Sequence, residues 1–142
     1  MRDQVILRVV SKITAPFILV FGFYVMAHGE LSPGGGFQGG VVLASAFILY
    51  GLVFGPAELD EIVPRRVTDG LAGFGVLLYV VVGLVGIVGD YRCLDYAPLR
   101  ITGPESAESW GMTLVEYGVG ITVASVMITV YREVSQAGTA EK

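Results

Sequence analysis

An isolated acidic residue in an apolar segment is the first candidate for chemistry in this sequence. Glu116 is the single charge in the 20 residues from Met112 to Tyr131, a run long enough to cross a hydrocarbon core about 30 Å thick as a helix. A charge at mid-helix is disfavoured by about 3 kcal/mol on insertion scales, so Glu116 should face protein or water. This predicts a role in proton or cation handling. The competing interpretation is a protonated acid that only bonds to a neighbouring helix.

Helical spacing identifies the residues that share a face with this acid. Thr113 lies one turn before Glu116, and Gly120 lies one turn after it. Thr113 can donate a hydrogen bond to the carboxyl group, and Gly120 can admit a neighbouring helix. Val123 and Met127 continue the same face.

A glycine-rich string between the first two apolar segments is the second candidate. It reads Ser32, Pro33, Gly34, Gly35, Gly36, Phe37, Gln38, Gly39 and Gly40. Consecutive glycines at a helix start can take positive φ angles and leave backbone N–H groups facing a cavity, where the helix dipole favours an anion or a carboxylate. The alternative is a tight reversal between two touching helices, anchored by Phe37. It is not a phosphate loop, because no Lys-Ser or Lys-Thr pair follows the glycines.

Four other polar residues have two interpretations each. His28 and Glu30, near the outer end of the first segment, could form a proton relay, although a lone histidine at an interface often only makes a hydrogen bond. Asp69 precedes the third segment, where a helix N-cap belongs, and a transport role is the alternative. Lys12 either pairs with an acid of another helix or extends to the headgroups.

Several classes of function are excluded by what the sequence lacks. The single cysteine, Cys93, has no partner for a disulfide, and with only one histidine no zinc site or redox pair can be assembled. No nucleophile with an adjacent base and no cofactor fingerprint is present, so we expect no cofactor, no metal and no catalysis by this chain alone. The net charge of -4 argues against a nucleic-acid partner.

The composition indicates an integral membrane protein. Hydrophobic residues make up 54% of the 142 residues, charged residues 15%, and the chain has 20 glycines; the mean hydropathy is +0.70. Four apolar segments are long enough to span a bilayer. We therefore predict one all-α membrane domain over residues 1–142, with transmembrane helices at about 5–27, 37–54, 71–89 and 112–131.

The lysines and arginines predict the orientation of these spans. Cytoplasmic ends of transmembrane segments are enriched in basic residues. One side of the predicted topology has seven of them, against two on the other side, Arg92 and Arg100; the seven are Arg2, Arg8, Lys12, Arg65, Arg66, Arg132 and Lys142. Both termini should therefore be cytoplasmic, with Tyr91, Tyr96 and Trp110 in the outer aromatic belt.

Small residues recur at the spacing that lets membrane helices approach closely. These residues are Gly36, Gly40 and Ala44 in the second segment, Gly83, Gly86 and Gly89 in the third, and Gly118, Gly120 and Ala124 in the fourth. They either close a four-helix bundle or meet other chains. Because stripes on three helices exceed the needs of a small bundle, we expect a subunit of a larger assembly.

Two of these motifs together resemble a known family. The string from Pro33 to Val41 and the later string from Val115 to Gly120 are similar to those of the MnhB/MrpB family, whose members belong to multi-subunit cation/proton antiporters of the Mrp or Mnh type. The resemblance extends over nearly the whole chain. It implies a small plasma-membrane subunit, inactive alone, that assembles with proton-pumping subunits similar to those of respiratory complex I and takes part in exchange of cytoplasmic Na+ for external H+.

The sequence departs from this family at two places. The family commonly has a histidine three residues before the proline, where this chain has Glu30, and an aspartate where this chain has Glu116. Related subunits also occur in membrane-bound hydrogenases, so such a respiratory complex is the alternative host. A small multidrug exporter would require a carboxylate in the first span, which Ile13 to Ala27 lacks. A purely structural spacer is a further alternative.

Overall fold

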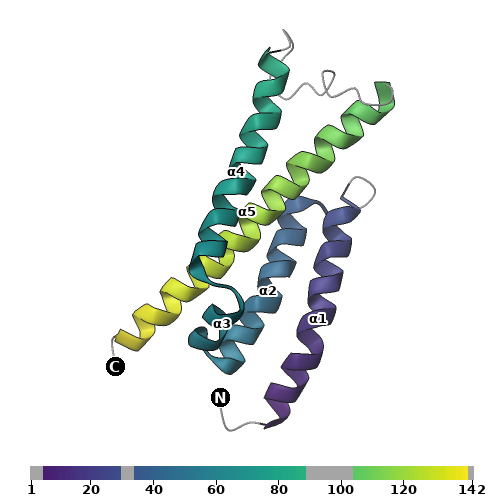
Figure 1. The fold of residues 1–142 in the computed structure, drawn as a ribbon. Helices are drawn as coiled ribbons and strands as arrows, with labels where there is room; N and C mark the ends of the chain where they lie inside the picture. The colour runs from purple at the N-terminus through teal and green to yellow at the C-terminus, as the bar shows by residue number, and fades with distance from the viewer. Residues whose placement is uncertain (1–4, 30–33, 89–103, 141–142) are drawn as a thin grey trace.

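The computed structural model describes the backbone of residues 5–29, 34–88 and 104–140, and the side chains of 5–29, 34–84 and 111–138. The described backbone forms five helices (Figure 1), which are α1 (Val5–Ala27), α2 (Gly36–Phe54), α3 (Pro56–Ile62), α4 (Arg65–Val88) and α5 (Pro104–Ala140).

Four of these helices are long and apolar enough to cross a membrane, which confirms the prediction of an all-helical protein with four spans. The span in α1 covers Val5–Ala27 and continues through Pro16, and that in α2 covers Gly36–Phe54. The other two helices continue beyond their apolar runs, because α4 already begins at Arg65 and α5 covers Pro104–Ala140. Polar and charged residues at their ends remain helical, so these helices are longer than hydropathy predicted.

The four long helices form a row in the order α4, α5, α2 and α1. Helix α5 packs against α4 on one side and α2 on the other, and α1 packs mainly against α2. Figure 1 shows the start of α1 and the end of α5 at the same end of the bundle. The last span therefore packs between the α1–α2 hairpin and α4.

The connection between α2 and α4 contains the short helix α3. Gly55 has a φ of 108°, which a glycine adopts without strain, and it ends α2 by donating a backbone hydrogen bond to Gly51 O (2.8 Å). Pro56 then begins α3, where its missing N–H costs nothing. This helix was not predicted, because a short acidic segment gives no membrane-span signal.

Helix α4 begins six residues earlier than the expected third span, so the interpretation of Asp69 as an N-cap is wrong. The first turn of α4 forms directly after Pro64, whose carbonyl accepts a hydrogen bond from Val67 N (2.9 Å). Asp69 lies inside the helix and is exposed. Hydropathy could not predict the first residue of α4, because the charged residues before Leu71 interrupt the apolar run without interrupting the helix.

A cluster of buried apolar side chains joins α2, α3 and α5. Ala44 and Leu59 are fully buried, and Ile128 is nearly so. Phe47, Ile48, Tyr50 and Tyr131 pack around them. Leu59 gives α3 its place in the fold, because it inserts between the two long helices.

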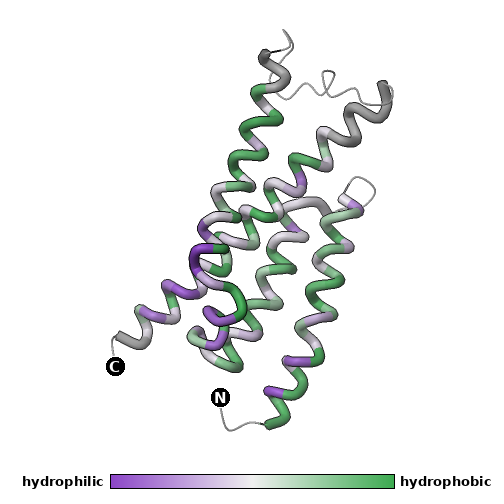
Figure 2. Tube along the Cα trace, in the orientation of Figure 1, coloured by the Kyte–Doolittle hydropathy of each residue, from purple (hydrophilic) through white to green (hydrophobic). Residues whose placement is uncertain are grey.

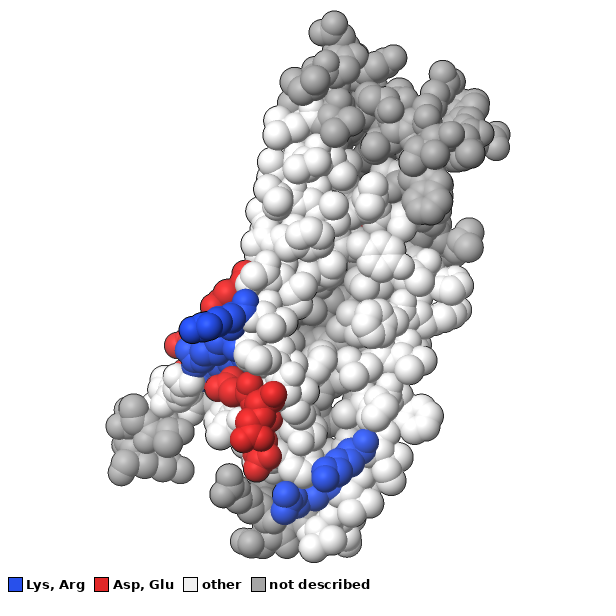
Figure 3. All heavy atoms as spheres, viewed as in Figure 1, with Lys and Arg blue, Asp and Glu red and all other residues white. Residues whose placement is uncertain are grey.

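Apart from Glu116, the charged side chains that the structure describes lie toward one end of the molecule. Figure 2 shows the hydrophilic stretches at the start of α1, around α3 and toward the end of α5, while most of α4 is hydrophobic. In the view of Figure 3, the blue and red side chains lie in separate groups over the lower half of the molecule, and the rest of the described surface on this face is uncharged. At this end, Arg8 and Lys12 of α1 lie over the ring of Phe54, 5.0 and 5.3 Å from its centroid. Charged side chains at one end of a long uncharged surface are the arrangement expected where membrane-spanning helices leave the bilayer.

Candidate functional site

The carboxyl group of Glu116 lies against glycines of the α1–α2 connection. A Cβ atom built on Gly29 would lie 2.6 Å from the carboxyl carbon, and one on Gly35 would lie 3.2 Å from Oε1. A Cβ on Gly36 would overlap the backbone carbonyl of Glu116 itself. The acid of the fourth span therefore occupies space that exists only because these three positions have no side chains. We call Gly29, Gly35, Gly36 and Glu116 the carboxyl seat.

The seat lies where α2 begins. Gly35 has a φ of 109° and stands at the N-cap position of α2, where it has no side chain of its own to cap the first turn. Positive φ at this glycine fits the expectation from the glycine-rich string, although the helical Gly36 does not share it. The carboxyl group of Glu116 is thus close to the positive end of the α2 dipole, which favours negative charge.

Close backbone contact between α2 and α5 continues below the seat. A Cβ on Gly40 would lie 3.1 Å from Gly120 Cα, and one on Gly120 would lie 3.0 Å from Gly36 O. Gly118 faces α4 instead, where a Cβ built on it would lie 3.0 Å from Gly75 O. The small residues that the sequence singled out on these two helices are therefore used within the chain.

Other small residues of the predicted stripes have different surroundings. Ala44 and Gly83 are buried, and Ala124 is partly buried. Gly39 packs on Met26 of α1, whose Cβ would be 2.8 Å from an added methyl group. Gly86 belongs to α4 but lies outside the described side chains, and Gly89 lies outside the described residues.

Phe37 does not anchor the turn. Its side chain is 64% exposed, and it lines a shallow groove of about 590 Å³ on the outer face of α1 and α2, together with Phe21, Tyr24 and Gln38. Phe37 points away because Gly36 and Gly40 take the face of α2 that touches α5. The glycines at the start of α2 therefore allow close backbone contact with α5, and Phe37 does not anchor the reversal between α1 and α2. Pro33 lies outside the described residues.

The structure does not bring the other residues predicted for an ion path as close to the Glu116 carboxyl group as the glycines of the carboxyl seat. Thr113 lies one turn before it on α5, is partly buried, and like Glu116 is engaged in an interaction. His28 is exposed; its Nδ1 lies 3.1 Å from Tyr24 O and its ring stacks on Tyr24. Glu30 lies outside the described residues.

Asp69 belongs to the opposite end of α5. It lines a polar cavity of about 120 Å³ with Arg65, Thr68, Thr129, Arg132 and Glu133. Thr129 is thirteen residues beyond Glu116, or about 20 Å along the helix. Asp69 and Glu116 therefore do not form one site.

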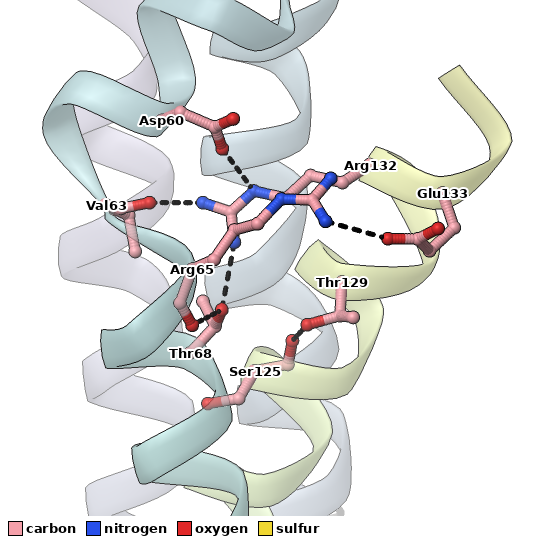
Figure 4. Close-up of polar contacts among 8 residues, drawn as sticks. All are labelled: Asp60, Val63, Arg65, Thr68, Ser125, Thr129, Arg132 and Glu133. Carbon is pink, nitrogen blue, oxygen red and sulfur yellow. Dashed lines mark hydrogen bonds and ion pairs between the residues drawn. The ribbon is translucent and has the colours of Figure 1, made fainter. Parts of the chain in front are cut away.

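A buried arginine, which the sequence analysis counted only as a cytoplasmic charge, organises that end (Figure 4). Arg132 is 1% exposed. Its Nη1 donates to Thr68 Oγ1 (2.9 Å) and its Nη2 to Val63 O, and its Nε forms an ion pair with Asp60 Oδ1 at 2.8 Å. The three groups belong to α3, the α3–α4 connection and α4. One guanidinium therefore holds this connection on α5.

The neighbouring ion pair is of a different kind. Arg65 Nη1 lies 3.2 Å from Glu133 Oε1, with side chains 45% and 62% exposed. An exposed pair of this type contributes little to stability.

Within the described residues, no group of three or more potential metal-ligating side chains is present.

Comparison with known proteins gives one consistent family. Residues 6–129 match the family described as a domain related to the MnhB subunit of Na+/H+ antiporter. A protein of Staphylococcus haemolyticus whose name describes it as an antiporter subunit, mnhB2, is 34% identical over 131 residues, covering 90% of this chain and 92% of the relative. The protein of the same name from Staphylococcus epidermidis is 34% identical, and the match covers 94% of this chain and 95% of the relative. That from Staphylococcus aureus strain Newman is 32% identical over 139 residues.

Proposed function

The chain belongs to the family of domains related to the MnhB subunit of Na+/H+ antiporters, and from this premise we propose that it acts as a membrane subunit of a multi-subunit Na+/H+ antiporter in which Glu116 lies on the ion path. The family and the four apolar helices make it a multi-pass protein of the plasma membrane. The named relatives favour an antiporter over a hydrogenase-type host.

The carboxyl seat is the observation that carries the ion-path role. An acidic residue inside an apolar span is costly, so it is expected either to take part in transport or to bond to a partner. Here Gly29 and Gly35 leave room for the carboxyl group beside the start of α2, and Gly36 lets α2 approach the backbone of Glu116. A carboxyl in such a place can release and take up a proton, or meet a cation, while the surrounding helices exclude lipid. A spacer with no transport role would not need this position to be acidic.

The charge distribution supports cytoplasmic termini. Arg8 and Lys12 lie near the start of α1, Arg65 starts α4, and Arg132 lies toward the end of α5; α1 starts and α5 finishes at the same end of the molecule (Figure 1). Cytoplasmic ends of spans are enriched in such residues. The seat would then lie toward the external side of the membrane, because Glu116 is about 24 Å along α5 from Arg132 at the cytoplasmic end.

Partner subunits are part of this proposal. Because Gly36, Gly40, Gly118 and Gly120 are used within the chain, partners would contact other surfaces, such as the aromatic groove around Phe37. The resemblance to Mrp-type systems suggests partners similar to the proton-pumping subunits of respiratory complex I. On this view the chain catalyses no reaction alone.

Isolation of the intact assembly tests the subunit role. A C-terminally tagged chain would be extracted in mild detergent from its own cells, and all co-purifying chains identified by mass spectrometry, with iron and nickel measured in the same sample. Large multi-span subunits without these metals would support the antiporter. Nickel-containing and iron–sulfur partners would identify a hydrogenase-type host instead, and recovery of the chain alone would contradict a subunit role.

A further inference from the structure

Gly29 has an environment unlike that of the other described glycines. The three nearest heavy atoms to a Cβ built on it are Cδ, Oε1 and Oε2 of Glu116, all at 2.6 Å or less. Contacts this short do not occur at real Cβ atoms. An added methyl group would therefore have to displace the carboxyl group, or the turn that follows α1 would have to move.

The neighbouring glycine of the seat meets a different part of the same residue. A Cβ on Gly36 would lie 2.7 Å from the carbonyl carbon and 2.9 Å from the Cα of Glu116. Its conflict is therefore with the backbone of α5. Gly36 controls how closely α2 approaches α5, whereas Gly29 controls the space that the carboxyl group itself fills.

We propose that Gly29 is a positioning residue for Glu116: its missing side chain creates the space in which the carboxyl group of the ion path is held. Gly29 precedes the glycine-rich string and has no role in the sequence motifs. For its effect on exchange this inference rests on the proposed role of Glu116, but the fit between the two residues also has a consequence for assembly.

The proposal predicts that shortening the acidic side chain at position 116 compensates for a side chain added at position 29. Aspartate at position 116 would draw the carboxyl group back by about one carbon–carbon bond, or about 1.5 Å. A methyl group on residue 29 would then be near ordinary van der Waals distance, about 3.5–4 Å. Glu116→Asp should thus relieve a conflict at Gly29. It should not relieve one at Gly36, where the backbone is the obstacle.

The test uses the whole antiporter complex, expressed with Gly29→Ala, Gly36→Ala, Glu116→Asp and the two double variants. Assembly is measured by co-purification of the other subunits. Na+-driven proton movement in everted vesicles is measured across a pH series and expressed per assembled complex. Gly73→Ala, where a Cβ would meet nothing within 4 Å, is the matched control.

We expect Gly29→Ala to lower assembly, or to lower exchange per assembled complex by roughly tenfold, since misplacing a positioned group by about 1 Å can cost about 10²-fold. Its pH profile should differ from that of the wild type. In Gly29→Ala/Glu116→Asp, assembly, rate and pH profile should return to those of Glu116→Asp, while Gly36→Ala/Glu116→Asp should remain as impaired as Gly36→Ala.

A Gly29→Ala complex with normal assembly, rate and pH profile would overturn the proposal, as would a double variant no better than Gly29→Ala. Failure of the proposed function has a separate signature. If Glu116→Gln retains full exchange, Glu116 is not on the ion path; rescue of assembly by Glu116→Asp would still establish the fit between Gly29 and the carboxyl group.

Discussion

Arg132 on α5 donates a hydrogen bond from Nη1 to Oγ1 of Thr68 on α4, over 2.9 Å and across 64 residues of sequence. Thr68 in turn donates to the carbonyl of Arg65 (2.9 Å) in the first turn of its own helix. Both side chains are about 1% exposed. This contact joins the end of the last span to the start of the third.

Removal of the guanidinium should destabilise the protein strongly. Arg132→Met keeps the volume near the site but leaves Val63 O and Asp60 Oδ1 without their partner. Loss of one partner from a buried charged network costs several kcal/mol; with Asp60 partly exposed, we expect about 2–4 kcal/mol. The measurement is the thermal unfolding midpoint of the purified complex in detergent.

Arg65→Met is the matched control for that variant. Its ion pair with Glu133 is exposed on both sides, so we expect a change of no more than about 1 kcal/mol. Equal losses of stability in the two variants would show that burial of Arg132 has no special consequence.

Thr68→Val tests the hydroxyl that Arg132 and Arg65 share. The substitution keeps the shape of the side chain but removes an acceptor and a donor from a buried position, which should cost about 1–3 kcal/mol. Thr129→Val is the comparison, because Thr129 Oγ1 only donates to the carbonyl of Ser125 in its own helix (3.0 Å). A Thr68→Val complex as stable as Thr129→Val would contradict the arrangement around Arg132.

Gly75→Ala should loosen the contact between α4 and α5. Its Cβ would lie 3.0 Å from Thr122 N and overlap Thr122 Oγ1. Overpacking of a close helix contact typically costs about 1–3 kcal/mol, which should appear as a lower thermal midpoint. Gly70→Ala, with nothing within 4 Å of the added Cβ, should be neutral or slightly stabilising, since alanine favours helix.

The orientation can be tested with single cysteines. Cys93 is the sole cysteine of the chain and lies in the connection expected outside, whereas Glu61 is exposed on α3 at the charged end. A membrane-impermeant maleimide should label Cys93 in intact cells, and Glu61→Cys in a Cys93→Ser background only in everted vesicles. The reverse pattern would place the termini outside.

The four spans could be predicted from sequence because each contains an apolar run long enough for a bilayer. Their ends could not, because helix continues through charged residues once backbone hydrogen bonds and a buried partner are available. Asp69 illustrates this: the apolar run starts after it, yet the first turn of α4 already forms on the Pro64 carbonyl. The short helix α3 depends on Leu59 filling a space between α2 and α5, which only the assembled fold reveals.

The candidate site was predictable in part. Glu116 stands out as an acid in an apolar span, and the glycines stand out by their number. That Gly29 faces the carboxyl group could not be predicted, because it depends on the depth at which α5 passes the α1–α2 turn. Arg132 was missed as an organising residue for a similar reason. Its partners are far away in the sequence, and an arginine at the end of a span resembles an ordinary interfacial charge.

The proposed role of Glu116 is tested most directly by the initial rate of Na+-driven proton movement in everted vesicles, measured per assembled complex for Glu116→Gln. The substitution keeps the size and hydrogen-bonding capacity of the side chain but cannot exchange a proton. Glu133→Gln, an exposed acid on the same helix, is the matched control. We predict that Glu116→Gln assembles normally and exchanges at a small fraction of the wild-type rate, while Glu133→Gln is unaffected. A normally assembled Glu116→Gln complex with the wild-type rate would contradict the ion-path role.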